Sequence, residues 1–171
     1  MPKVSVIVPI YGVEEYIERC ARSLFEQTMD DMEFIFVNDC TKDNSMDVLQ
    51  RVMKDYPNRR EQIKIICHTE NKGLPQARKT GILVSTGDYI AHCDSDDWME
   101  HDAYQLLYEK AINSESDMVF FDYCRTDGIT KEDFTAKIEG YGIEDLIVRM
   151  IAGKILFGVV FHLDGTIHNF V

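Results

Sequence analysis

Three carboxylates stand within four residues in the stretch Asp94-Ser95-Asp96-Asp97-Trp98. This acidic stretch directly follows a short apolar segment, residues 89–93. Carboxylates with this spacing suit a hard divalent cation that also holds phosphate oxygens, because Mg²⁺ and Mn²⁺ take oxygen ligands in proteins. The alternative is that one acid caps a helix predicted just downstream. A cap needs only one acid, so the cluster favours a metal or ligand site.

The elements that must position these acids follow a repeated pattern of short apolar runs and amphipathic segments. Pro9 is expected to end the first strand because proline lacks a backbone N–H, and Pro75 lies near the first turn of a helix. Strands that alternate with helices predict an α/β fold, a Rossmann-like, mostly parallel sheet flanked by helices. Strands are expected at residues 4–9, 34–37, 63–67, 89–93 and 118–121, and helices at residues 13–24, 48–56, 77–84 and 103–111.

The carboxyl ends of parallel strands share one edge of a sheet, and ligands bind at that edge in such folds. Three predicted strands end there in Pro9-Ile10-Tyr11, in Asn38-Asp39 and in the acidic stretch. These segments are therefore predicted to form one pocket.

Composition narrows the classes of partner. A net charge of -12 argues against a nucleic-acid surface, which needs clustered Lys and Arg, but leaves a small phosphate ligand held through a metal. The five cysteines are odd in number and widely spaced, which gives neither a zinc site nor a disulfide framework. No signal peptide and no membrane-spanning apolar stretch is found, so a cytoplasmic location is expected, with peripheral contact at the inner face of a membrane left open.

The last third of the sequence carries weaker patterns. A turn is expected at residues 126–128 and an amphipathic helix at residues 143–152, ending at Gly153. Residues 155–171 are apolar without a clear pattern. An exposed apolar tail would favour a homo-oligomer.

The sequence contains five motifs: VSVIVPIY at residues 4–11, FIFVNDCTKDNS at residues 34–45, NKGLPQAR at residues 71–78, GDYI at residues 87–90 and DSDDW at residues 94–98. In this order and at this spacing they resemble glycosyltransferase family 2, from about Lys3 to Gly153. The resemblance implies a GT-A fold and one domain, 1–171, in which residues 1–123 bind a nucleotide sugar and residues 124–171 form part of the acceptor side. It also implies inverting, metal-dependent sugar transfer, with Mn²⁺ or Mg²⁺, from a donor expected to be UDP-linked. The acceptor is a saccharide, a lipid-linked carbohydrate or another hydroxyl compound.

Two matched positions lie in the loop that follows the first strand. Pro9 and Tyr11 match residues that lie against the nucleotide base in this family, and a tyrosine ring can stack on a base. The alternative for Tyr11 is a structural, half-buried aromatic residue.

The remaining matched positions are charged. Asp39 matches an acceptor for the N–H of the base, with a turn residue as the alternative, and Arg78 matches a basic residue that faces the phosphates, with a solvated helix arginine as the alternative. Asp96 matches the residue that holds the ribose hydroxyls. Asp97 matches the metal ligand, and Asp94 is expected to support both.

The sequence also departs from the family pattern. Asn38, Cys40 and Gly12 replace residues that are common there, and the expected general base is not found. Glu144-Asp145 is interpreted as a solvated helix start, and Phe170 stands where an acid is expected. A non-catalytic nucleotide-binding module, a donor half without its acceptor half, therefore stays open as an alternative, and slow turnover is expected of this chain alone.

Overall fold

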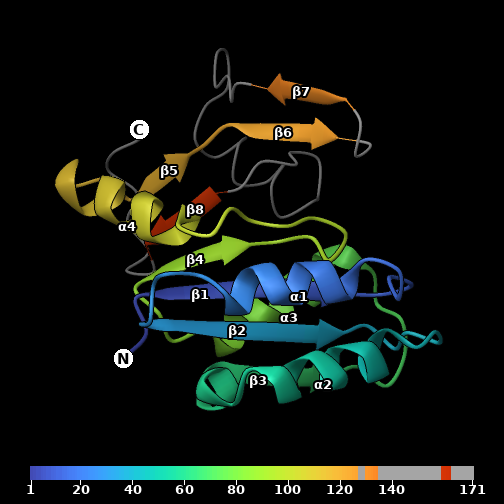
Figure 1. Ribbon diagram of the computed structural model, residues 1–171. Coiled ribbons are helices and arrows are strands. Elements are labelled where there is room, and N and C mark those ends of the chain that lie inside the picture. Colours follow the sequence, from blue (N-terminus) through green and yellow to red (C-terminus); the bar gives the residue numbers. More distant parts are fainter. Residues whose placement is uncertain (127–129, 135–158, 163–171) are drawn as a thin grey trace.

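The computed structural model describes residues 1–126, 130–134 and 159–162. Within them the chain forms a six-stranded sheet with helices on both faces and a separate two-stranded hairpin (Figure 1). The strands are β1 (Val4–Ile10), β2 (Met32–Asn38), β3 (Ile63–Cys67), β4 (Tyr89–His92), β5 (Met118–Phe120), β6 (Tyr123–Thr126), β7 (Lys131–Phe134) and β8 (Val159–His162). The helices are α1 (Ile17–Phe25), α2 (Ser45–Asp55), the 3₁₀ helix η1 (Pro57–Gln62), α3 (Leu74–Val84) and α4 (Ala103–Asn113).

The large sheet has the strand order β3-β2-β1-β4-β8-β5. β1 pairs in parallel with β2 and β4, and β2 pairs in parallel with β3. β8 is antiparallel to both of its neighbours, β4 and β5. The predicted α/β fold with a mostly parallel sheet is confirmed. Residues 159–162, for which the sequence pattern predicted no element, form β8.

The sheet has a hydrophobic core on each face, because neighbouring side chains of a strand point to opposite sides. β1 is buried along its whole length, and this explains why its sequence is apolar throughout instead of alternating. Residues of α1, α2 and α4 pack on one face. Ala77 and Ile82 of α3 pack with Ile7 of β1 on the other. Helices therefore cover both faces, as Figure 1 shows for α1 and α3.

β1 runs through Pro9 to Ile10, so the prediction that proline ends this strand is wrong. In a parallel ladder the backbone groups of successive residues point to opposite neighbouring strands. Pro9 is therefore oriented like Ile7, two residues before it. The carbonyl of Ile7 accepts a hydrogen bond from Cys93, on the β4 side. Pairing with β4 ends at Ile7 and His92, so the missing N–H of Pro9 breaks no ladder bond.

α1 begins at Ile17 instead of the predicted Val13. Residues 13–16 form a turn that closes with a hydrogen bond from the Ile17 N–H to the Val13 carbonyl, 3.0 Å long. The N–H of Val13 donates to Ser45 Oγ and the N–H of Glu14 donates to Asp43 Oδ2. The N–H groups of Val13 and Glu14 therefore bond to side chains that follow β2, and residues 13–16 stay outside the helix. α2 and α3 begin at residues 45 and 74, earlier than predicted.

β6 and β7 pair antiparallel, from Tyr123 with Phe134 to Thr126 with Lys131. Residues 127 and 128 of the turn predicted at residues 126–128 lie outside the described residues. The helix predicted at residues 143–152 lies outside the described residues, as do Glu144-Asp145, residues 155–158 and Phe170. No helix among the described residues is long and apolar enough to cross a membrane.

Candidate functional site

A pocket of ≈ 340 Å³ opens where β1, β2 and β4 end. It brings together Pro9, Tyr11, Asp39, Asp94 and Asp96, all of which were candidate site residues, whereas Arg78 and Asp97 do not line it. The single pocket predicted at this edge of the sheet is therefore present. Its lining is Pro9, Ile10, Tyr11, Asp39, Asn71, Gly73, Leu74, Ala77, Asp94, Ser95 and Asp96.

The aromatic wall of the pocket is Tyr11, which is 52% exposed. This exposure fits both a ring that can stack on a base and the half-buried structural alternative. The loop turns at Gly12, whose φ of +69° favours glycine, and the Gly12 N–H donates to Thr41 Oγ1 at 2.9 Å. In the facing loop the N–H of Thr41 donates to Asn38 Oδ1, at 2.8 Å. Tyr11 thus stands on a loop anchored to the loop after β2.

Asp39 is a buried acceptor of hydrogen bonds, 3% exposed. Its Oδ1 accepts hydrogen bonds from His68 Nδ1 (2.6 Å) and the Lys72 N–H (2.9 Å), and its Oδ2 accepts one from the Gly73 N–H (2.7 Å). Burial alone would raise the pKa of Asp39, but these hydrogen bonds outweigh it and hold the pKa below its usual value. Asp39 is therefore a charged group that fixes the loop before α3.

Arg78 lies beneath the pocket instead of inside it. The side chain is 6% exposed, and its Nη2 donates to Asp94 Oδ1 at 2.7 Å. The alternative of a solvated helix arginine is therefore wrong. His92, the last residue of β4, has a pKa lowered to about 4 by its burial and then by the charge of Arg78. Arg78 thus holds the carboxylate of Asp94 at the floor of the pocket.

Asp96 and Asp97 form the exposed end of the acidic stretch. The N–H of Asp97 donates to the Asp94 carbonyl at 3.0 Å, which makes a tight turn and gathers the three carboxylates. Partial removal from water raises the pKa of Asp97, and the charges of Asp96 and Asp94 raise it further. The capping alternative fails for α4, because its N-cap is Asp102.

The donor set fits a hard divalent cation that a ligand helps to hold. The neighbouring acids raise the pKa of Asp97, which favours a positive charge nearby. Among the described residues no group of three or more His, Cys, Asp or Glu side chains is placed to enclose a metal ion. Phosphate oxygens and water would therefore have to supply part of the coordination, as they often do for Mg²⁺.

His68 belongs to none of the five motifs, although its side chain contacts Asp39 of the site. His68 Nε2 lies 2.9 Å from Thr80 Oγ1 on α3 while its Nδ1 contacts Asp39, so the ring joins two elements. A usable signal was its place directly after β3, at the same edge of the sheet as Asp39. The nearby Asn71-Lys72-Gly73 opens the motif NKGLPQAR, and the N–H groups of Lys72 and Gly73 are donors to Asp39.

Relatives among known proteins are glycosyltransferases. The chain is 43% identical over 119 residues to the uncharacterised glycosyltransferase EpsJ of Bacillus subtilis strain 168, which covers 70% of this chain and 33% of that protein. It is 31% identical over 155 residues to glycosyltransferase GlyG of Streptococcus pneumoniae serotype 4, covering 85% of this chain and 49% of that protein. The chain therefore spans between about a third and a half of the length of these relatives.

Solved structures show the same fold. S. aureus TarS 1–349 in complex with UDP superposes with a TM-score of 0.67 at 24% identity, over 75% of this chain and 37% of that TarS 1–349 chain. The mannosyltransferase PcManGT from Pyrobaculum calidifontis, in complex with GDP-Man and Mn²⁺, gives a TM-score of 0.64 at 23% identity, over 70% of this chain and 35% of that one. These likenesses identify a GT-A fold. The sequence model described as Glycosyl transferase family 2 matches residues 5–162, and the chain belongs to that family.

Proposed function

We propose that the pocket holds the nucleoside diphosphate part of a sugar donor, with uridine diphosphate as the expected nucleotide, and that the chain takes part in transferring the sugar to a hydroxyl group. The carrying observation is that one pocket gathers Pro9, Tyr11, Asp39, Asp94 and Asp96 from three strand ends. Support comes from the two structural neighbours, one bound to UDP and the other to GDP-Man with Mn²⁺.

The base would lie between the Tyr11 ring and the loop after β2. A carboxylate oxygen has two lone pairs, and Asp39 Oδ1 already accepts two hydrogen bonds while Oδ2 accepts one. One acceptor position on Oδ2 remains for the N–H of a uracil ring. Tyr11, half-exposed at the rim, would stack on the base. Asp96 would accept hydrogen bonds from the ribose hydroxyls.

The diphosphate would lie over the acidic stretch, where Asp97 is the proposed ligand for Mn²⁺ or Mg²⁺. When bound, such a cation stabilises negative charge on the departing diphosphate. Arg78 is paired with Asp94 at 2.7 Å, so we assign it to positioning Asp94 in place of direct contact with phosphate. The binding role of Arg78 is therefore indirect.

The transfer step would need a base for the proton of the acceptor hydroxyl. We assign that base to no residue, because the segment expected to hold it lies largely outside the described residues. Inversion at the sugar, a saccharide or lipid-linked acceptor, and the division into a donor part (1–123) and an acceptor part (124–171) are proposals that rest on family membership.

Calorimetry with UDP, GDP and CMP, each in Mn²⁺ and in chelator, tests the proposal. We expect UDP to bind in Mn²⁺ and its affinity to fall at least about tenfold in chelator. Tyr11→Ala should weaken UDP binding, whereas Tyr16→Phe, a change at an exposed tyrosine just before α1, should not. Equal UDP affinity with and without metal, or no binding of any nucleotide, would refute the proposal. Release of UDP from UDP-sugars, stimulated by an acceptor, distinguishes a transferase from a nucleotide-binding module.

A further inference from the structure

The acidic stretch belongs to a segment without regular structure of its own. β4 ends at His92 and α4 begins at Ala103, so residues 94–102 belong to no strand or helix, although Arg78 of α3 holds the Asp94 carboxylate. The hydrogen bond from the Asp97 N–H to the Asp94 carbonyl joins two residues of the same turn, so it does not fix the turn relative to the rest of the fold. Placement of the carboxylates to within a fraction of an ångström therefore needs contacts from another element.

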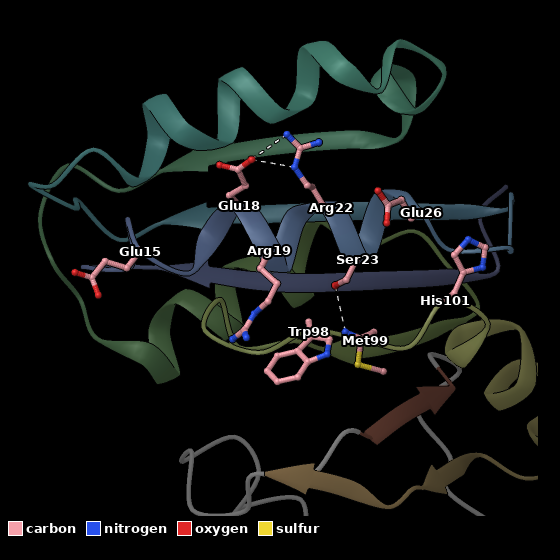
Figure 2. A pocket seen from close by; sticks show the side chains of 9 residues that line it. All are labelled: Glu15, Glu18, Arg19, Arg22, Ser23, Glu26, Trp98, Met99 and His101. Carbon is pink, nitrogen blue, oxygen red and sulfur yellow. Dashed lines mark hydrogen bonds and ion pairs between the residues drawn. The ribbon is translucent and has the colours of Figure 1, made fainter. Parts of the chain in front are cut away.

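One face of α1 supplies these contacts. Arg19 and Ser23 lie four residues apart on this face of α1, and Gln27, two residues beyond the end of the helix, continues the line. These three polar residues are called the α1 stripe. Figure 2 shows Arg19 and Ser23 of this stripe facing Trp98 and Met99, beside a groove of ≈ 590 Å³. The hydrogen bonds are Arg19 Nη2 to the Asp96 carbonyl (3.1 Å), the Met99 N–H to Ser23 Oγ (3.1 Å), Gln27 Nε2 to the Glu100 carbonyl (2.6 Å) and the Tyr104 N–H to Gln27 Oε1 (3.2 Å).

Gln27 anchors the far end of the stripe. It is 3% exposed, and its amide group is fully used: Nε2 donates to the Glu100 and Ser23 carbonyls while Oε1 accepts from Tyr104. A buried amide in this state has little freedom to turn, because any rotation leaves a polar group unpaired. The backbone of the segment is thereby held at its α4 end.

Arg19 holds the end nearest to the carboxylates. Its guanidinium carbon lies 3.8 Å from the centre of the Trp98 ring, and its Nη2 donates to the Asp96 carbonyl. One planar group therefore contacts both neighbours of Asp97. Cation–π stacking with a tryptophan and a hydrogen bond from the same guanidinium fix its plane as well as its position.

We propose that the α1 stripe of Arg19, Ser23 and Gln27 positions the acidic stretch, and that Arg19 is the positioning residue that sets the affinity of the metal and nucleotide site. The effect on affinity rests on the proposed function. The effect on the segment does not, because it concerns contacts within the chain. Arg19 is not a ligand in this proposal, since both of its contacts are to the protein.

The chain has one tryptophan, so intrinsic tryptophan fluorescence reports on Trp98 alone. Acrylamide quenching should increase about twofold in Arg19→Ala, because the guanidinium covers one of the two ring faces. In the same variant we expect the Kd for UDP in Mn²⁺ to rise roughly tenfold, the scale of one charge-assisted contact. The matched control is Arg51→Ala, which removes a 65% exposed arginine of α2 that pairs with Glu18.

Arg19→Lys separates charge from geometry, because lysine keeps the charge but lacks the planar guanidinium. We expect the Trp98 quenching and the Kd for UDP of Arg19→Lys to lie closer to those of Arg19→Ala than to those of the unchanged chain. Full recovery in Arg19→Lys would overturn the proposal, since charge alone would then suffice. Urea unfolding of each variant separates positioning from general stability, because a purely structural role would lower the urea midpoint and leave the Kd of the folded protein unchanged.

The two proposals fail in different ways. If the unchanged chain binds no UDP in Mn²⁺, the proposed function fails, and Trp98 quenching alone still decides whether α1 holds the segment. If UDP binds but Arg19→Ala and Arg51→Ala give the same Kd, the positioning role of Arg19 is overturned. If Arg19→Ala leaves Trp98 quenching unchanged, the stripe does not hold the acidic stretch.

Discussion

Asp39 and Asp97 are carboxylates with opposite surroundings at the same edge of the sheet. Asp39 is buried among N–H donors, which hold its pKa below the usual value, whereas partial desolvation and two neighbouring acids raise the pKa of Asp97. Environments that move two pKa values apart separate their roles. Asp39 already accepts three hydrogen bonds and organises a loop, while Asp97 is stabilised by whatever cation approaches it.

The first prediction concerns Asp97→Asn. Because the folded-state pKa of Asp97 is raised, its charge costs stability at neutral pH, and this cost disappears as pH falls through that pKa. The substitution should therefore raise the urea midpoint at pH 7 slightly, by about 0.5 kcal/mol or less for an exposed group, and should weaken UDP binding in Mn²⁺. Asp47→Asn on α2 is the matched control. A clear loss of stability in Asp97→Asn would contradict the metal-ligand assignment.

A second prediction at this scale concerns Asp43, which ties the loop after β2 to the loop that carries Tyr11. Burial would raise its pKa, but hydrogen bonds from Ser45, Thr41 and the Glu14 N–H lower it to about 2. A lowered folded-state pKa gives stability that is present above the ordinary value near 4 and is lost as pH falls toward 2.

Asp43→Asn should therefore be less stable than the unchanged chain by roughly 1–2 kcal/mol at pH 7. This difference should shrink between pH 5 and pH 3, because protonation removes the same charge from the unchanged chain. Urea unfolding at several pH values measures it, with Asp47→Asn as the control. A difference that stays constant with pH would exclude the charge of Asp43 as its cause.

Residue types and spacing predicted which groups gather at the site better than they predicted how each one acts. Pro9, Tyr11, Asp39 and the acidic stretch follow strands, and strand ends in a parallel sheet converge. Spacing does not say that Arg78 is buried against Asp94, because that pairing depends on how α3 lies across the sheet. The role of His68 was missed for the same reason, since its partners come from β2 and α3.

At the scale of elements, the parallel strands and their helices were predictable because each one carries its own periodic pattern. β8 has four residues and lies between β4 and β5, to which it is distant in sequence. The hairpin of β6 and β7 also has four residues in each arm. β4 is equally short but belongs to the alternating order of strands and helices, whereas β6, β7 and β8 stand outside that order, so their partners decide their structure.

The packing of α3 on β1 leads to a prediction that is tested by the sign of a stability change. A Cβ atom built on Gly81 would lie 2.4 Å from Ile7 Cγ2, and Ile7 is fully buried in the central part of the sheet. In a helix without such a contact, Gly→Ala stabilises by roughly 0.5–1 kcal/mol. Here we expect Gly81→Ala to destabilise by about 1–3 kcal/mol, because α3 must move away from the sheet.

Urea unfolding of Gly81→Ala measures this effect, and Lys79→Ala at an exposed site of the same helix is its control. A shift of α3 would also disturb the pairing of Arg78 with Asp94, so UDP affinity should fall together with stability. A stabilised Gly81→Ala variant would show that α3 does not pack closely on β1.

For the molecule as a whole, the proposed site joins elements that are far apart in sequence. Its lining runs from Pro9 to Asp96, and the acidic stretch rests on α1. The chain carries a net charge of -12, and the acidic stretch concentrates three of its carboxylates. A metal and nucleotide bound there would reduce the repulsion among these carboxylates. They would bind only to the folded chain, because β1, β2, β4 and α1 together form and support the site. Binding should therefore stabilise the entire fold.

The last prediction follows from this linkage. A ligand that binds only the folded state adds about 2.7 kcal/mol to its stability at a concentration of 100 times its Kd. For a domain of this size that corresponds to a rise in Tm of roughly 5–10 °C. We expect this rise with UDP and Mn²⁺ together, a smaller one with either alone, and none with both in excess chelator. Thermal unfolding of Asp97→Asn and Asp47→Asn in the same four conditions identifies the source, because only Asp97→Asn should lose the joint effect. An equal rise in both variants would place the bound metal away from the acidic stretch.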